Sequence, residues 1–272
     1  MLTWARKIPS KGMVLTKRRR FVLISILLSV GLWVIQRLPV ESRYFSIALV
    51  GVVTYLLAAW ALFKDLHGPA GWIVNLLLPT LYPVSIALFY FLLPQAWATR
   101  LVIVILFAVS MYALLLTANI FAVASIRTIQ LLRAARAVGF LLSILTSAFL
   151  FHVIFSLRLP VWIVVGMVYV VSLPILWQGT WSYVVSTSVK KEFYYAMVGA
   201  TILANMALAL SFWLIDVPLA SVMLAMAMYV ILGLCQHDLE GRLFKRTVQE
   251  YMGFAGIVFV VVSLAVMLKW MK

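Results

Sequence analysis

The sequence has few of the residues that a soluble enzyme needs on its surface and in its active site. Lys, Arg, Asp and Glu together make up 11% of the 272 residues, whereas a soluble domain has about 25%. Cysteine occurs once, at Cys235, which excludes an internal disulfide and a thiolate metal site. No polar stretch is long enough to fold separately. These shortages exclude a soluble catalytic domain and predict a chain embedded in a membrane.

Long apolar runs fill the chain from residue 21 to residue 270, and hydrophobic residues account for 66% of the sequence. A helix needs roughly 20 apolar residues to cross a hydrocarbon core of about 30 Å. Helices are expected because backbone groups in lipid must be satisfied within each segment. The predicted spans are residues 21–37, 44–63, 72–93, 101–122, 138–157, 160–178, 194–215, 217–234 and 253–270.

The fold class is therefore all-α, a polytopic transmembrane helical bundle of about nine spans. A basic segment at residues 1–20 precedes a single transmembrane domain at residues 21–272. The basic segment resembles the start of a signal peptide, but no small-residue cleavage site follows it. We therefore expect the first span to be retained.

Acidic residues are scarce, with 7 Asp and Glu against 22 Lys and Arg. Most of the basic residues fall on one side if the N-terminus is cytoplasmic, as the positive-inside rule requires. With an odd number of spans, the C-terminus then lies outside. The weakest boundary is the tight turn at Ile215–Pro218, because a single span there would move the following basic loop to the other side. The basic residues flank apolar runs, so anionic lipid is the expected partner and nucleic acid is not.

Two loops on the predicted cytoplasmic side share the pattern Asp-Leu-x-Gly, at residues 65–68 and 238–241. Carboxylates and imidazoles could hold a metal or a phosphate if the loops met. The candidate polar cluster comprises Asp65, His67, His237, Asp238, Glu240 and Arg242. A glycine after a helix end is also an ordinary C-cap. We therefore expect Asp65 and Asp238 to lie apart, and we expect no metal and no cofactor.

Residues 126–138 have the pattern of a short amphipathic helix on the inner membrane surface. Ile126, Ile129, Leu132 and Ala135 recur at helical spacing, and the arginines lie at other angles. The predicted contacts with anionic headgroups are Arg127, Arg133, Arg136, Lys190 and Lys191.

The predicted spans hold few groups that could carry chemistry. No Lys or Arg lies in mid-span, and His152 is the one histidine within a span. Proton- and ion-coupled transporters usually keep ionisable groups there. No metalloprotease, nucleotide-binding or serine-hydrolase motif occurs. Ala200 and Ala204 form a small-residue pair, and we expect at least one of them to face a neighbouring helix.

Two stretches resemble a known family. The first is Lys64-Asp65-Leu66-His67-Gly68, with Phe89 to Pro94 after it. The second is Gln236-His237-Asp238-Leu239-Glu240-Gly241-Arg242. Together they resemble an uncharacterised family of multi-pass membrane proteins from candidate-phylum bacteria. The resemblance implies a bacterial inner-membrane setting and no catalytic residues.

Three functions remain open. The first is a non-enzymatic structural or interaction component of the plasma membrane, with other membrane proteins as partners. The second is a transporter or flippase-like protein for an apolar or lipid-linked substrate, which a polar cavity around Asn75, Thr80 and Asn119 would indicate. The third is a membrane enzyme acting on a lipid phosphate, which would need the two polar loops to meet.

Overall fold

The computed structural model describes residues 16–37, 39–63, 65–66, 68–93, 96–124, 130–184 and 190–270. Within these ranges the chain forms nine α-helices and no strand. The helices are α1 (Lys17–Ile35), α2 (Val40–Leu62), α3 (Gly68–Tyr90), α4 (Trp97–Ala124), α5 (Leu132–Ser156), α6 (Val161–Val184), α7 (Lys190–Phe212), α8 (Val217–Leu239) and α9 (Lys245–Trp270). Nine helices were predicted, and α7 and α8 are separated at the tight turn.

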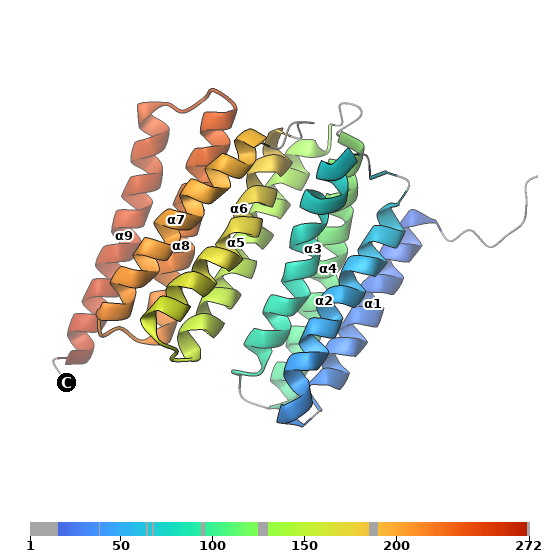
Figure 1. Cartoon of the computed structure of the whole chain (residues 1–272), viewed down its shortest axis with the longest axis horizontal. Coiled ribbons are helices and arrows are strands. Elements are labelled where there is room, and N and C mark those ends of the chain that lie inside the picture. The colour runs from blue at the N-terminus through green and yellow to red at the C-terminus, as the bar shows by residue number, and fades with distance from the viewer. Residues whose placement is uncertain are drawn as a thin grey trace, which may run out of the picture.

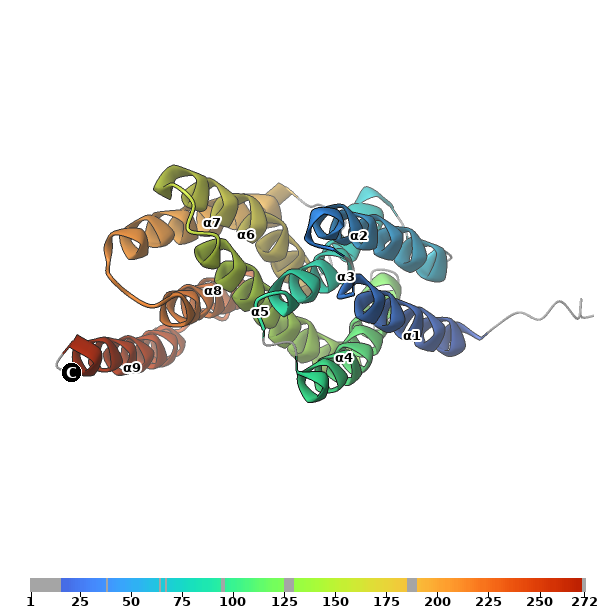
Figure 2. The ribbon, with the colours of Figure 1, turned by 90° about the horizontal axis from the view of Figure 1, so that it is seen from below.

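The helices form two lobes that meet along the middle of the molecule (Figure 1). One apolar core joins α1 to α4 around Phe21 and Met111, and a second joins α5 to α9 around Phe151 and Met228. In the view from below, α3 and α5 lie at the centre, where they pack against each other (Figure 2). Successive helices alternate in direction, so α1 begins at one end of the bundle and α9 finishes at the other.

We call the end at which α1 begins the upper end, as it is drawn in Figure 1. Several helices extend further at this end than the predicted spans. Helix α5 begins at Leu132 instead of residue 138, α6 ends at Val184 instead of 178, and α9 begins at Lys245 instead of 253. An apolar run marks the hydrocarbon core, whereas Lys, Arg, Gln and Glu are good helix formers that prolong a helix beyond it.

The surface helix predicted at residues 126–138 is wrong. Residues from Leu132 onward belong to α5, which continues unbroken to Ser156. Residues 125–129 lie outside the described part of the chain. Arg133 and Arg136 are therefore carried by the first turns of a long apolar helix.

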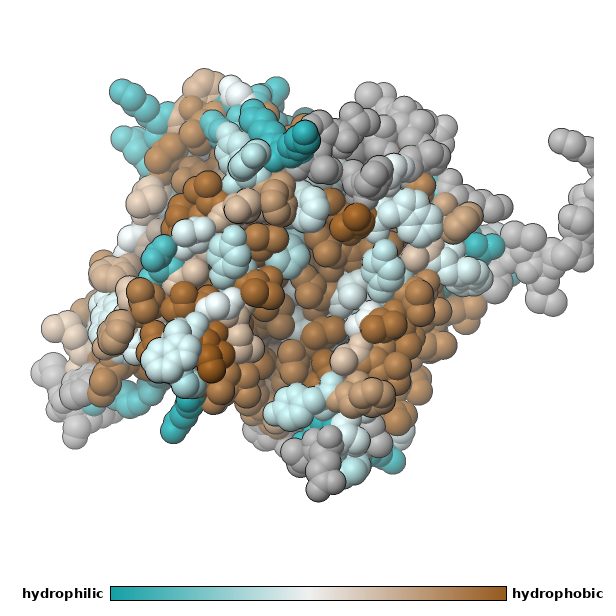
Figure 3. All heavy atoms as spheres, in the orientation of Figure 1, coloured by the Kyte–Doolittle hydropathy of each residue, from teal (hydrophilic) through white to brown (hydrophobic). Residues whose placement is uncertain are grey.

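Eight of the helices, α2 to α9, are long and apolar enough to cross a membrane. Helix α1 differs because Lys17 and three arginines fill its first turn, which leaves an apolar stretch from Phe21 to Ile35. On the face shown in Figure 3, apolar side chains cover the middle of the bundle, and polar ones gather at its upper and lower ends. This distribution is that of a membrane-embedded protein.

Helix α7 packs closely against its neighbours through small residues. Ala200 is fully buried and Ala204 nearly so, which confirms the packing prediction. A Cβ atom at Gly199 would come within 2.8 Å of Ile231 Cγ2 and 2.9 Å of Leu176 Cδ1. Only small side chains allow α6, α7 and α8 to approach so closely.

Candidate functional site

Polar side chains from several helices meet at the upper end, around the last turn of α8. We call this set the α8-end cluster. Its members are Arg136, Tyr183, Tyr195, His237, Asp238, Glu240 and Arg242. It brings together most of the predicted polar cluster and one of the predicted lipid contacts.

Glu240 lies between two arginines. Arg136 Nη1 of α5 is 3.1 Å from Glu240 Oε1, and Arg242 Nη1 is 3.9 Å from Glu240 Oε2. The Arg136 guanidinium also lies over the ring of Tyr183 on α6, 4.5 Å from its centroid. Arg136 was predicted to contact lipid headgroups, and in the structure its guanidinium joins α5 and α6 to the end of α8.

Asp238 joins α8 to α7. The Tyr195 hydroxyl donates a hydrogen bond to Asp238 Oδ2. The Lys191 ammonium lies 5.9 Å from the centroid of the Tyr195 ring. The carboxylate is thus held by a phenol whose ring also faces a cation.

His237 and Gly241 shape the end of α8. His237 Nδ1 lies 2.9 Å from the Gly233 carbonyl oxygen one turn earlier, and its ring packs edge-on against Tyr251 of α9. Gly241 has φ +69°, and the following Arg242 N–H donates to the His237 carbonyl at 2.9 Å. This geometry is the left-handed C-cap that the sequence suggested.

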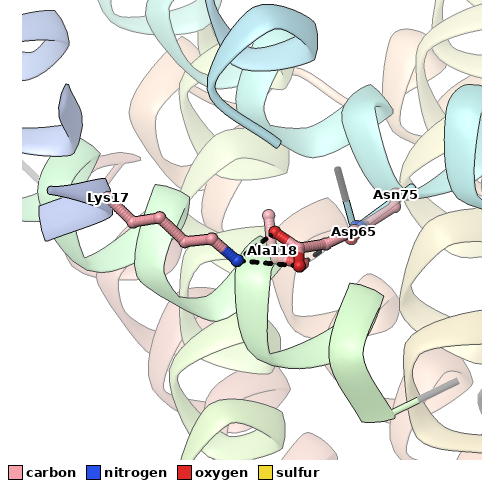
Figure 4. Close-up of polar contacts among 4 residues, drawn as sticks. All are labelled: Lys17, Asp65, Asn75 and Ala118. Carbon is pink, nitrogen blue, oxygen red and sulfur yellow. Dashed lines mark hydrogen bonds and ion pairs between the residues drawn. The ribbon is translucent and has the colours of Figure 1, made fainter. Parts of the chain in front are cut away.

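Asp65 belongs to a separate contact. Lys17 Nζ of α1 lies 2.8 Å from Asp65 Oδ1 and 2.7 Å from Oδ2 (Figure 4). Asp65 therefore pairs with α1, while Asp238 pairs with α7. In the ranges that the structure describes, no group of three His, Cys, Asp or Glu side chains could hold a metal ion. His67 lies outside those ranges.

The amides and hydroxyls within the spans are used unevenly. Asn75 is fully buried, and its Nδ2 donates to the Ala118 carbonyl of α4 at 2.9 Å (Figure 4). Thr80 Oγ1 donates to the Leu76 carbonyl of its own helix at 2.8 Å. Asn119 instead lies on the wall of an open groove at the upper end.

The other predicted lipid contacts stay at the surface. Arg133, Lys190 and Lys191 are exposed at the starts of α5 and α7, and Arg127 lies outside the described residues. Sequence reasoning missed Lys17, Tyr183, Tyr195 and Tyr251. Tyrosines near span ends are typical of the aromatic belt, so nothing singled these out.

Residues 21–265 match a family described as a protein of unknown function, DUF5656. The chain belongs to this family. The resemblance to an uncharacterised family is confirmed, while the bacterial origin remains a prediction. No curated protein and no solved structure matches the chain. The matched range contains the helices and loops of the α8-end cluster and begins after Lys17 and Arg18.

Proposed function

We propose that this DUF5656 protein is a nine-span component of the cell inner membrane with a cytoplasmic N-terminus and a structural or interaction role. The short apolar part of α1 is compatible with a ninth span, because arginine side chains can reach the headgroups while Phe21 to Ile35 stays in hydrocarbon. The upper end carries the basic loops, which supports a cytoplasmic placement under the positive-inside rule.

The observation that carries the proposed role is the use of carboxylates to join helices. Glu240 ties the end of α8 to α5, and Asp65 ties the turn after α2 to α1. At the lower end, Asp216 before α8 pairs with Lys269 of α9 at 2.6 Å. A carboxylate that acts as a general acid or base must lie within hydrogen-bond reach of its substrate, directly or through one water. These carboxylates instead contact cations of neighbouring segments, as expected of a scaffold.

Exchanging the charges of the Arg136–Glu240 ion pair tests this role. Arg136→Glu places two carboxylates together and Glu240→Arg gathers three cations, so each should lower the midpoint of thermal unfolding in detergent. The double variant R136E/E240R restores an opposite-charge pair and should recover most of the loss. Arg133→Glu is the matched control, because Arg133 is exposed at the same end of α5.

A phosphatase assay tests the enzyme alternative. Wild type and E240Q would be reconstituted in vesicles that contain phosphatidic acid, and inorganic phosphate release would be measured. We expect no release above that of empty vesicles. Release by wild type that is lost in a folded E240Q variant would replace the structural role with a catalytic one.

A lipid carrier is the second candidate, and the groove that holds Asn119 favours it. A protein that moves a lipid-linked substrate needs an open groove with a few polar groups rather than buried charges. Accelerated movement of a fluorescent phosphatidylglycerol between the leaflets of reconstituted vesicles would support this function. Movement no faster than in empty vesicles would exclude it for that lipid.

A further inference from the structure

A groove opens at the upper end between α1, α4 and α5. In the view from below, α4 lies between the other two helices (Figure 2). The groove has a volume of about 720 Å³, within the range of ligand pockets of about 300–1,000 Å³. Its walls include Lys17 and Arg18 of α1, Tyr112 and Asn119 of α4, and Ala134 of α5.

The groove is deep enough for one leaflet of a bilayer. Along α4 its wall extends from Tyr112 to Val123, a rise of about 16 Å at 1.5 Å per residue. Half of a hydrocarbon core measures about 15 Å. Between these positions the wall is mainly aliphatic, with Leu116 and Ile120 among its residues. A groove of this depth fits one acyl chain of a lipid from the leaflet at the upper end.

Two cationic side chains lie at the mouth of the groove, which is its upper end. Lys17 and Arg18 form the first turn of α1, and both are exposed. Lys17 shares its charge with Asp65, whereas Arg18 makes no ion pair with any residue in the described ranges. The free N–H groups of a helix start also favour an anion. The mouth is therefore complementary to a phosphate group.

A polar group without a hydrogen-bond partner lies below the two cations, toward the middle of the bundle. Asn119 lies five residues before the end of α4, about 7.5 Å along the helix axis. Its Oδ1 atom is buried and has no hydrogen-bond partner in the described part of the chain. A buried amide oxygen without a partner is costly. Water that hydrates the ester groups of a bound phospholipid, just below its phosphate, would supply the missing hydrogen bond.

We propose that the groove between α1, α4 and α5 binds one anionic phospholipid. The phosphate lies against Arg18 and Lys17, the glycerol ester region lies beside Asn119, and an acyl chain follows α4 toward Tyr112. This inference requires the membrane location proposed above, but neither the orientation nor the absence of catalysis.

Native mass spectrometry of the full chain in detergent tests the site, with phosphatidylglycerol and phosphatidylcholine as competing probes. Wild type should retain phosphatidylglycerol preferentially. Arg18→Gln should lower that retention about fivefold, the equivalent of about 1 kcal/mol for one cationic contact. Ala134→Trp places a large ring on the groove wall and should abolish retention of both lipids.

Matched controls separate this site from general lipid contact. Lys245→Gln removes an exposed cation from the start of α9, and Ala137→Trp adds the same ring at an exposed position of α5 outside the groove wall. Both should retain phosphatidylglycerol as wild type does. Equal losses in controls and test variants, or full retention by A134W, would overturn the proposal. Dissociation of a dimer in A134W, with lipid retention unchanged, would assign the groove to a second copy of the chain.

Discussion

The ring of Tyr251 on α9 lies directly over Gly233 on α8. A Cβ atom at Gly233 would overlap the phenol ring and its hydroxyl. Tyr251 also contacts the rings of Tyr229 and His237, with centroids 5.1 and 5.7 Å away. Because α9 packs chiefly on α8, this contact fixes the upper half of α9 to the bundle.

Replacing Gly233 by alanine should therefore loosen α9. Overpacking of this kind costs about 1–3 kcal/mol, and we expect a lower unfolding midpoint with faster hydrogen exchange in α9. Gly253→Ala is the matched control, because no atom lies within 4 Å of a Cβ there. Removing a helical glycine alone should stabilise by about 0.5–1 kcal/mol. Equal midpoints for the two variants would show that Tyr251 yields without cost.

A larger side chain at Ala204 should destabilise the lobe formed by α5 to α9. Ala204 is 6% exposed on the packed face of α7, so Ala204→Leu forces a neighbouring helix outward. We expect a loss of about 1–3 kcal/mol, measured as a lower midpoint of thermal unfolding in detergent. Val198→Leu, on a side chain that is 61% exposed, is the control and should change little. An unaltered midpoint for A204L would mean that this face of α7 contacts lipid.

The number and rough position of the helices could be predicted because hydropathy reports directly which residues sit in hydrocarbon. The helix ends could not, since the polar residues that follow an apolar run decide whether the helix continues. Lys245 to Met252 contains Lys, Arg, Gln and Glu and continues α9 upward as a helix. Because polar residues continue the helices in this way, Arg136 lies within α5 and Glu240 directly follows α8. Their side chains can therefore pair.

The candidate site could be predicted only where its residues are neighbours in sequence. His237, Asp238 and Glu240 are adjacent, so their grouping was evident. Tyr195, the partner of Asp238, is 43 residues away in the sequence, and Arg136, the partner of Glu240, is 104 residues away. A single sequence contains no signal for such pairs, because every tyrosine or arginine near a span end has the same local pattern.

The orientation of the chain in the membrane decides which leaflet supplies the lipid in the groove. In a Cys235→Ala background, single cysteines would be placed at Arg242 at the upper end and Leu159 at the lower end, both at exposed positions. A membrane-impermeant maleimide should label Leu159→Cys in intact cells and Arg242→Cys only after permeabilisation. A cysteine at Lys272 should behave like the one at Leu159, because α9 finishes at the lower end. The reverse pattern would place the N-terminus outside.

A cysteine at Arg37 tests whether α1 is a true span. Arg37 follows α1 at the lower end, and its guanidinium lies 3.8 Å from the centroid of the Trp33 ring. If α1 crosses the membrane, Arg37→Cys should react in intact cells, while Arg19→Cys in its first turn should need permeabilisation. Both cysteines reacting on the same side would mean that α1 lies along the surface. The groove beside α1 would then lose the helix that supplies its cations.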